Sequence, residues 1–440
     1  MPLSRRQFIR GAASAALVAP YFWIPVAGQT RKVRHASFGA GGQALSDINA
    51  FSKHPAFELV AVADVDLCRL DRVLERFPAV RVYQDWRELL QKEGRRLDSV
   101  NVSTPDHMHA LQAMAAMRAG KHVYVQKPLA ATLRETRAVT EYARRARVVS
   151  QMGIQVSSFE AQRYGEWLVR SGVVGKIREV HTFSNKSWGD DKPLPDGVDQ
   201  VPPTLDWDEW LGVAGTRPFK RNVYHPGHWR RRIGFGTGTL GDMGCHIYSP
   251  PYRALKLTAP LRVTSHGPQP TAESWATRAR VHLVYPGTEY TAGPEIDVWW
   301  YDGGEQPPEA LRAQVGPRMP DQGSIIVGTD GLIVLPHMTA EPFALPDEKM
   351  ATVQKPALTP RDHYGEFLDA VLAGSGPCSA GFDYSGPLTE SVLIGNVAAH
   401  FPGETLQLDA ARLVFTNKPE ASEHLSRDYR RGWRIKGAKV

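Results

Sequence analysis

The sequence predicts an α/β fold with two domains, a doubly wound parallel sheet followed by an α/β domain with an open, mainly antiparallel sheet. Three observations support this fold class. The 440 residues exceed what one ordinary hydrophobic core accommodates. Short β-rich runs alternate with helical stretches over residues 33–153, which is typical of a parallel sheet. Beyond residue 153 strand-like runs follow one another instead, so we place the domains at residues 30–153 and 154–440.

Composition and charge favour a soluble globular protein. Hydrophobic residues make up 42% of the chain and charged residues 22%. The formal net charge of +7 arises at the two ends, because residues 1–29 carry three arginines and residues 425–440 carry six basic residues and one acid. The body between them is at about −1, so no nucleic-acid partner is expected, and the basic end is interpreted as a solvated or subunit-docking segment. Three scattered cysteines fit neither a disulfide framework nor a zinc site, and no metal is expected.

Residues 1–29 have the organisation of an export signal. The stretch "SRRQFIR" at 4–10 supplies paired arginines, and the apolar run at 11–27 is interrupted by Pro20 and Pro25, which makes it a poor membrane span. The pattern predicts a twin-arginine signal peptide cleaved near residues 27–29, and a periplasmic protein with no stable membrane span after processing. The alternative is an uncleaved anchor helix that carries the arginine pair.

The predicted parallel sheet begins with four short runs rich in β-branched residues. They are "VRHASF" at 33–38, "ELVAVAD" at 58–64, "SVNVST" at 99–104 and "HVYVQ" at 122–126. Helical stretches lie between them, such as "DLCRLDRVLERF" at 66–77 and "HALQAMAAMRAG" at 109–120. Sheets of this kind bind ligands at the carboxyl ends of their strands, so the residues that follow each run are the functional candidates.

A glycine-rich turn follows the first run. Its residues match the pattern G-x-G-x-x-A: Gly39, Ala40, Gly41, Gly42, Gln43 and Ala44. Such a turn admits a pyrophosphate close to the backbone and to the N–H groups of the next helix. Asp64 closes the second run 25 residues after Gly39, where a carboxylate binds ribose hydroxyls and repels a 2′-phosphate, so NAD is predicted rather than NADP. The alternative is an ordinary turn and a strand-end aspartate.

Two further segments, "STPDHMHA" at 103–110 and "QKPLA" at 126–130, stand at the ends of the third and fourth runs. Their candidate cofactor-binding residues are Ser103, Thr104, Pro105, His107, His109, Gln126 and Lys127. A lysine at the rim of the nicotinamide crevice is also placed to transfer a proton. The alternatives are a solvated Lys127 and histidines that pack the start of a helix.

The second domain begins with the helical stretch "SFEAQRYGEWLVRSG" at 158–172 and the strand "IREVHTFSN" at 177–185. Strand-like runs at 279–285, 295–301, 323–329 and 331–336 predict the antiparallel sheet. A helix predicted over 242–257 places Asp242 and His246 on one face, either as functional groups or as a mutually satisfied core pair. The stretch "YHPGHWRRR" at 224–232 offers candidate substrate-binding residues, with loop packing as the alternative: Tyr224, His225, His228 and Trp229.

These motifs, together with "GKHVYVQKPLA" and "GVVGKIREV", resemble the family of glucose–fructose oxidoreductase, inositol 2-dehydrogenase and rhizopine-catabolism proteins (Gfo/Idh/MocA) over essentially the whole mature chain. The resemblance implies an NAD-binding Rossmann domain, a second domain that mediates homo-oligomers (dimers or tetramers), and a sugar-like substrate. It also implies catalytic roles for Lys127, Asp242 and His246, and cofactor contacts at 39–43, Asp64, 104–109 and Gln155. The glutamate that usually precedes the lysine is Gln126 here, which removes a negative charge beside Lys127.

We therefore expect an NAD-dependent oxidoreductase that acts on a secondary hydroxyl group of a sugar, glycoside or cyclic polyol. His246 would be the acid/base, Asp242 would orient its ring, and Lys127 would polarise the reacting oxygen. Because a periplasm holds no pool of free NAD, a tightly held and recycled cofactor is expected. One alternative is a redox-assisted glycoside hydrolase or lyase that oxidises its substrate transiently, and another is a non-catalytic sugar-binding scaffold.

Overall fold

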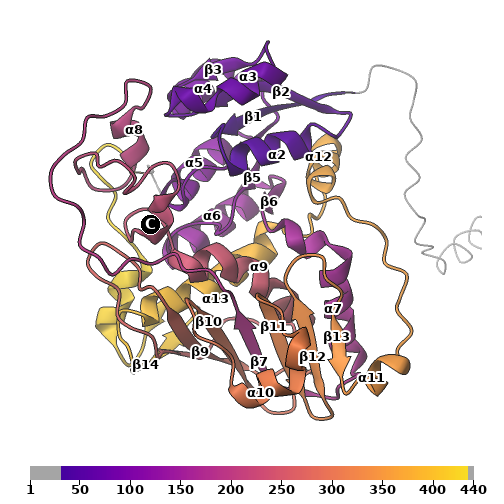
Figure 1. The fold of residues 1–440 in the computed structure, drawn as a ribbon. Helices are drawn as coiled ribbons and strands as arrows, with labels where there is room; N and C mark the ends of the chain where they lie inside the picture. The colour runs from indigo at the N-terminus through magenta and orange to yellow at the C-terminus, as the bar shows by residue number, and fades with distance from the viewer. Residues whose placement is uncertain (1–30, 435–440) are drawn as a thin grey trace, which may run out of the picture. The chain divides into compact units, whose positions relative to one another are not determined.

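Two β-sheets organise residues 31–434, the part of the chain that this computed structural model describes (Figure 1). The signal peptide expected at 1–29 and residues 435–440 of the basic end lie outside the described residues. The described residues from Lys32 onward form one compact unit. Its largest hydrophobic cluster takes buried side chains from both sheets, for example Val100 and Trp300, so the two sheets share a core.

The first sheet is entirely parallel, with the strand order β3-β2-β1-β4-β5-β6. Its strands are β1 (Val33–Phe38), β2 (Phe57–Ala63), β3 (Arg81–Tyr83), β4 (Ser99–Val102), β5 (His122–Val125) and β6 (Ser150–Met152). The strand order reverses between β1 and β4, which is where a doubly wound sheet opens its ligand crevice. The predicted doubly wound parallel sheet is confirmed, and the short strands β3 and β6 form its edges.

Helices and short turns join these strands: α2 (Gln43–Phe51), η1 (Leu67–Arg69), α3 (Asp71–Arg76), α4 (Trp86–Glu93), η2 (Gly94–Arg96), α5 (Asp106–Arg118) and α6 (Leu133–Ala146). The helix expected at 66–77 is divided into η1 and α3. α5 begins at Asp106, which places His107 in its first turn. α6 starts at a capping box, in which Thr132 and Glu135 each accept a hydrogen bond from the other's backbone N–H.

The second sheet has nine strands in the order β13-β12-β11-β7-β10-β9-β8-β14-β15. They are β7 (Ile177–Phe183), β8 (Arg262–Ser265), β9 (Ala279–Pro286), β10 (Glu295–Asp302), β11 (Gly323–Gly328), β12 (Leu332–Pro336), β13 (Phe343–Leu345), β14 (Thr405–Asp409) and β15 (Val414–Phe415). Only the pair of β7 and β10 is parallel among these described strands. The predicted open, mainly antiparallel sheet is confirmed.

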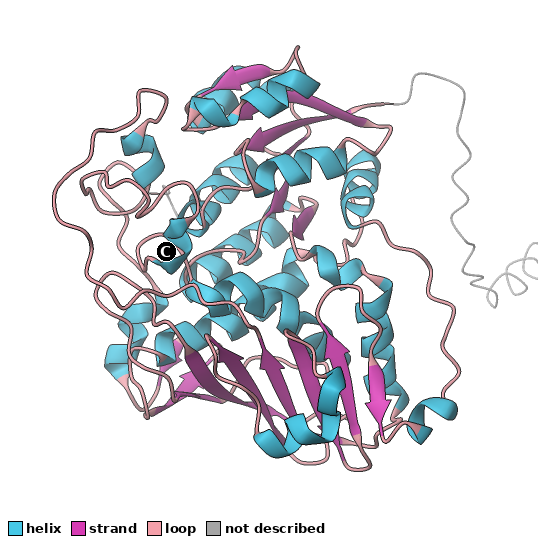
Figure 2. Cartoon of the chain, in the orientation of Figure 1, coloured by secondary structure: helices cyan, strands magenta, loops and turns pink. Residues whose placement is uncertain are grey.

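The remaining helices and turns are η3 (Gln155–Ser158), α7 (Glu160–Ser171), α8 (Trp207–Leu211), η4 (His228–Arg231), α9 (Gly238–Ala254), α10 (Glu309–Val315), η5 (Gly316–Arg318), α11 (Glu348–Ala351), α12 (His363–Ala373), α13 (Phe382–Ala398) and η6 (Pro419–Leu425). Helices of both parts lie between the two sheets (Figure 2). Where α9 meets α13, a Cβ on Gly244 would come within 2.8 Å of Val392 and one on Gly395 within 2.5 Å of Leu240. This close approach lets α13 bind α9 while it also packs on α6.

α9 begins at Gly238, four residues before the start that the sequence predicted. The chain is fixed just ahead of it, because the Thr237 hydroxyl donates to Asp106 (2.6 Å) and the Thr237 carbonyl accepts from Asn396 (2.8 Å). Asp242 therefore lies in the second turn of the helix rather than at its start.

Two segments connect the second part of the chain back to the first sheet (Figure 1). In the segment 184–237, Leu205 forms an isolated β-bridge with Asp66, and Arg87 pairs with Glu209. In the segment 426–434, Arg427 pairs with Glu135 of α6 at 2.9 Å. This part of the basic end is thus bound to its own chain rather than solvated. No helix within residues 31–434 combines the length and the apolar character that crossing a membrane requires.

Candidate functional site

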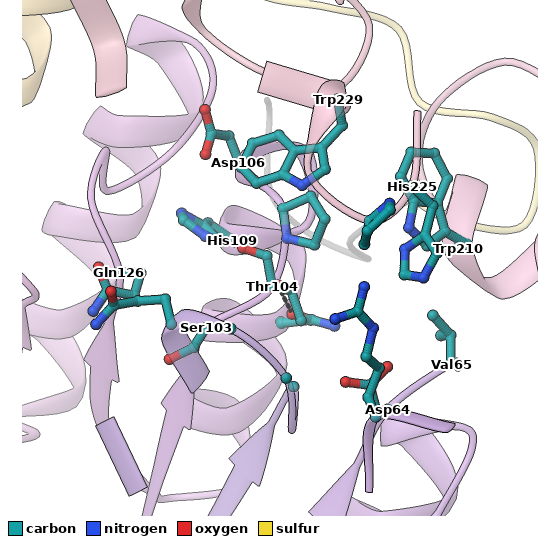
Figure 3. A pocket seen from close by; sticks show the side chains of 18 of the residues that line it. Asp64, Val65, Ser103, Thr104, Asp106, His109, Gln126, Trp210, His225 and Trp229 are labelled. Atoms are coloured by element: carbon teal, nitrogen blue, oxygen red, sulfur yellow. Dashed lines mark hydrogen bonds between the residues drawn. The ribbon is translucent and has the colours of Figure 1, made fainter. Parts of the chain in front are cut away.

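A cleft opens at the carboxyl ends of the parallel strands, where the segment 184–237 covers them (Figure 3). It contains about 1090 Å³ of empty space, with the solvent at its mouth included. The first part of the chain contributes Gly39, Gly41, Gly42, Gln43, Ala63, Asp64, Val65, Arg69, Gln84, Trp86, Ser103, Thr104, Pro105, Asp106, His109, Gln112, Gln126 and Lys127. The second part contributes Trp210, His225, Pro226, Trp229, Arg230 and Asp242.

The glycine turn is held between the end of β4 and Asp64. Gly39 has a φ of 101°, and a Cβ there would come within 2.8 Å of the Ser103 carbonyl oxygen, so only glycine fits. The Asp64 carboxylate accepts hydrogen bonds from the backbone N–H groups of Ala40 (2.8 Å) and Asp66 (3.0 Å). Burial raises the pKa of Asp64, and these two amides act in the opposite direction. The turn and the carboxylate are therefore fixed side by side.

The turn also leaves room for a ligand at the start of α2. Gly42 has a φ of 57°, and nothing lies within 4 Å of a Cβ added to it. No side chain caps the helix that follows. The Ala44 N–H donates to the Gly41 carbonyl oxygen at 3.2 Å, so the remaining N–H groups of the first turn are the ones that would bind an anion. These residues fit NAD, with the pyrophosphate at the turn and the ribose hydroxyls at Asp64.

Asp47 of α2 is the centre of a buried hydrogen-bond network. Its carboxylate accepts from Gln43 Nε2 (2.9 Å), Ser103 Oγ (2.7 Å) and the Tyr364 hydroxyl (2.8 Å). Gln126 Nε2 lies 3.0 Å from both of its oxygens. Burial raises the pKa of Asp47, and the donors act in the opposite direction. Three predicted cofactor-binding side chains are thus fixed by one carboxylate.

His109 is held between two backbone carbonyls at the wall of the cleft. Its Nδ1 lies 2.7 Å from the Pro128 oxygen and its Nε2 lies 2.8 Å from the Thr104 oxygen. A neutral imidazole has one N–H, so both contacts become hydrogen bonds only when the ring is protonated. Asp106 lines the same wall. Burial raises its pKa above the usual value, and the charge of His109 offsets part of this rise.

The structure brings together two of the predicted catalytic residues, Lys127 and Asp242. Lys127 Nζ lies 2.6 Å from Asp242 Oδ1 and 2.6 Å from the Asp242 carbonyl oxygen. Both side chains line the cleft and are largely buried, with 15% and 10% of their surface exposed. The Lys127–Pro128 peptide bond is cis. The loop after β5 and the second turn of α9 thus meet at this ion pair.

Three further side chains surround the Asp242 carboxylate. Trp188 Nε1 donates to Oδ2 at 2.9 Å, Arg230 Nε donates to Oδ1 at 3.4 Å, and Lys186 Nζ lies 3.8 Å from Oδ2. Burial alone would raise the pKa of Asp242, but the charges of Lys127 and Arg230 hold it well below its usual range. Asp242 is therefore an ionised anchor for the cations around it.

His246 lies one turn further along α9 and is not among the described residues that line the cleft. Its ring is buried, with its centroid 5.9 Å from that of His337, and its Nδ1 has no hydrogen-bond partner among the described residues. Burial, together with the charge of Lys127, holds the pKa of His246 well below its usual value. The ring does not line the described cleft, so a direct acid/base role for His246 stays a prediction.

Of the candidate substrate-binding residues, Trp229 and His225 line the cleft. His225 lies at the Asp64 end, because its Nε2 is 2.7 Å from Asp66 Oδ2. Tyr224 is buried in an aromatic cluster with Trp210, and His228 does not line the described cleft.

Three predicted cofactor-binding residues also lie off the described cleft. Ala40 is fully buried beneath the turn, with its backbone N–H bound to Asp64. His107 is packed against Trp210 and Phe235, and Gln155 donates to the Tyr364 hydroxyl at 3.0 Å.

The sequence analysis missed Asp47, Asp106, Trp188, Lys186 and Arg230. Only Asp47 and Asp106 carried a usable signal, since each lies within the first turns of a helix that leads away from a predicted ligand-binding loop. The other three belong to the irregular segment 184–237, whose path the local sequence does not determine. Within residues 31–434 no group of three or more metal-binding side chains comes together.

Comparison with known proteins places this site in a family context. The model of an oxidoreductase family described as an NAD-binding Rossmann fold, GFO_IDH_MocA, matches residues 33–154, and the model of its C-terminal α/β domain matches residues 168–293. Together they cover more than half of the chain.

Individual relatives are more distant. A levoglucosan dehydrogenase from Pseudarthrobacter phenanthrenivorans is 24% identical over 193 residues, 44% of this chain and 41% of the relative. A glycosyl hydrolase family 109 protein from Shewanella baltica is 29% identical over 205 residues, 40% of this chain and 44% of the relative. The chain thus matches less than half the length of each of these relatives.

Among solved structures, the fold is similar to that of the WlbA dehydrogenase from Bordetella pertussis in complex with NADH and UDP-GlcNAcA. The TM-score is 0.58 at 15% identity, over 86% of this chain and 99% of that one. At this identity the likeness concerns the fold alone. With both family domains matched in order and an NAD-compatible cleft on the first, the chain belongs to the Gfo/Idh/MocA family of NAD-binding oxidoreductases.

Proposed function

We propose that the protein is an NAD-dependent oxidoreductase that acts on a secondary hydroxyl group of a sugar, glycoside or cyclic polyol. The observation that carries this proposal is the Lys127–Asp242 pair, at 2.6 Å, in the same cleft as the glycine turn and Asp64. A proton-handling pair and a dinucleotide site in one cleft are what alcohol oxidation needs. The levoglucosan dehydrogenase among the relatives supports a sugar-like substrate.

When bound, NAD supplies the acceptor for the hydride that leaves the carbinol carbon. Lys127 Nζ hydrogen-bonds the hydroxyl oxygen and stabilises the negative charge that develops there as the proton leaves. Asp242 orients Nζ, and Trp188 and Arg230 orient Asp242. Nζ takes up the hydroxyl proton after the ammonium has released one of its own protons to the solvent at the mouth of the cleft. His246, which does not line the described cleft, and Lys127 act on each other electrostatically, so His246 serves in this proposal as a positioning residue.

The experiment that tests this proposal is incubation of the purified, NAD-loaded protein with a panel of sugars, glycosides and cyclitols. Reduced nicotinamide is followed by its near-ultraviolet absorbance, and the products are analysed by mass. The expected result is a loss of two hydrogens from the substrate with formation of reduced cofactor. A panel in which no member is oxidised or cleaved would contradict the proposal and favour a sugar-binding scaffold.

A redox-assisted glycoside hydrolase or lyase is the second candidate. The relatives named as glycosyl hydrolase family 109 proteins favour it, and the same cleft residues would serve. The product mass separates the two candidates, because cleavage releases an aglycone and returns the cofactor to its oxidised form.

We further propose that NAD is held tightly and recycled in place. Contacts across the cleft support this, since the segment 184–237 binds the strand end at Asp66 through His225 (2.7 Å) and Thr204 (2.9 Å). Such retention suits a protein that the proposed leader at 1–29 directs to the periplasm in the folded state. Protein purified without added cofactor is expected to release dinucleotide on denaturation.

A homo-oligomer, a dimer or tetramer, completes the proposal. Trp299 stacks on His282 on one side of the second sheet, with ring centroids 4.1 Å apart. Both rings are only partly buried in the single chain, and this apolar surface supports an interface with a second copy. Analytical ultracentrifugation tests this, and a species of monomer mass would contradict it.

A further inference from the structure

The Lys127 end of the cleft carries more positive than negative charge. Three cationic side chains, Lys127, Arg230 and Lys186, converge on the single carboxylate of Asp242, at 2.6, 3.4 and 3.8 Å. Within the described residues, Arg230 and Lys186 have no other carboxylate partner. One anion therefore faces three cations.

The other ionisable groups that face this cluster do not remove the excess. Asp106 lines the same cleft, beside His109, and both Lys127 and Arg230 act on it electrostatically. Even with Asp106 ionised and His109 neutral, the cations still outnumber the anions by one. His246 and His337 add no negative charge. The oxidised nicotinamide ring adds a positive charge, and the pyrophosphate belongs at the glycine turn.

Arg230 is fixed in position rather than free in solvent. Its guanidinium carbon lies 4.4 Å from the ring centroid of Trp229 and 5.6 Å from that of Trp188. Its side chain is 28% exposed and lines the cleft. An arginine that is held between aromatic faces keeps its planar set of donors available for an oxyanion.

The positive charges of this cluster also lower the pKa values of neighbouring groups. Burial and the charges of Lys186 and Lys127 lower the pKa of His337 to about 4. Burial and the charges of Lys127 and Arg230 also lower the pKa of Lys186. Next along the chain, Arg231 and Arg232 share the single carboxylate of Asp190. The residues between 1–29 and 425–440 carry a net charge of about −1, so this concentration of cations is local.

We propose that the substrate carries an anionic group, a carboxylate or phosphate on a sugar, which Arg230 binds while Lys127 engages the hydroxyl that reacts. This rests on the proposed function, of which it specifies the substrate class. Lys186, which pairs with Asp242 but does not line the described cleft, adds positive charge to this end of it. The anion would complete the charge balance that Asp242 and Asp106 leave open, and a neutral sugar would leave one cation of the cluster without a matching anion.

Binding of matched sugars to the NAD-loaded protein, measured by calorimetry, tests the proposal. The sets are glucose, glucuronate and glucose 6-phosphate, and galactose, galacturonate and galactose 6-phosphate. At least one acidic member is expected to bind about tenfold or more tightly than its neutral counterpart, the effect of one charge-assisted hydrogen bond. The advantage should shrink as salt is added, and the acidic member that binds distinguishes carboxylate from phosphate.

The variant Arg230→Gln is expected to lose most of this advantage. Lys186→Gln is expected to lose a smaller part, because Lys186 pairs with Asp242 but does not line the described cleft. Arg231→Gln is the matched control, because Arg231 pairs with Asp190 and does not line the described cleft; it should retain the preference. Acidic sugars that bind no better than neutral ones, or do not bind at all, overturn the inference. Because the measurement needs no turnover, its outcome is separate from the oxidation assay that tests the proposed function.

Discussion

The side-chain amide of Gln126 donates to the buried carboxylate of Asp47, with Nε2 at 3.0 Å from both oxygens. This pairing accounts for the departure from the glutamate expected at position 126. A glutamate there would place a second carboxylate against Asp47, where burial already disfavours the charged form. The amide instead supplies a donor, and it also fixes Gln126 at the wall of the cofactor cleft.

Gln126→Glu should therefore weaken both the fold and NAD binding. We expect a loss of about 1–3 kcal/mol in unfolding free energy, the cost of an unmatched buried polar pair, measured by urea denaturation. The double variant Asp47→Asn, Gln126→Glu restores one donor and one acceptor and should recover most of the loss. Equal stability of Gln126→Glu and the wild type would show that the pairing is unimportant.

Asp64→Ala should weaken NAD binding and narrow the preference over NADP. The carboxylate, fixed by the amides of Ala40 and Asp66, binds ribose hydroxyls in NAD and opposes a 2′-phosphate in NADP. Calorimetry with both dinucleotides measures the change. Tighter binding of NADP by the wild-type protein would contradict this assignment.

Lys127→Ala should reduce turnover by about 10²–10⁴-fold, the usual scale for a proton-transfer group, with NAD still bound. His246→Ala should reduce it less, because the ring does not line the described cleft. Steady-state kinetics on the identified substrate measure both. A loss in His246→Ala equal to that in Lys127→Ala would return the direct acid/base role to His246.

His225→Ala should lower the dinucleotide content of the purified protein. The Asp66–His225 contact at 2.7 Å joins the segment 184–237 to the first sheet beside Asp64. The control is His282→Ala, which removes a contact of the same length to Asp297 in the second sheet. Absorbance and mass after denaturation give the content. Full occupancy of His225→Ala would show that the contact does not retain NAD.

Asp302 should make stability depend on pH. Burial raises its pKa from 3.8 to about 7. Between these values the folded protein keeps a proton that the unfolded chain has lost, so unfolding releases a proton and stability falls as the pH rises. The loss is up to about 4 kcal/mol across this range. Asp302→Asn should remove this component of the pH profile from pH 4 to 7, and an unchanged profile would exclude Asp302 as its source.

Local patterns predicted those parts of the fold and site that local geometry determines. Gly39 and Asp64 could be placed because a strand, a turn and the next strand end fix their relation. Arg230 and Trp188 could not, because an irregular segment reaches Asp242 only through contacts made far along the chain. His246 shares a helix face with Asp242, but four residues also move it about 6 Å along the axis, which is enough to take it off the cleft.

The pairing of Arg430 with Asp208, across 222 positions of sequence, bears on the order of events during synthesis. The parallel sheet and its glycine turn can form while the ribosome is still translating. The covering segment gains its contacts with Arg430 and Arg427 only after those residues emerge. The last contacts that hold the cover over the cleft in place are thus made only at a late stage of translation.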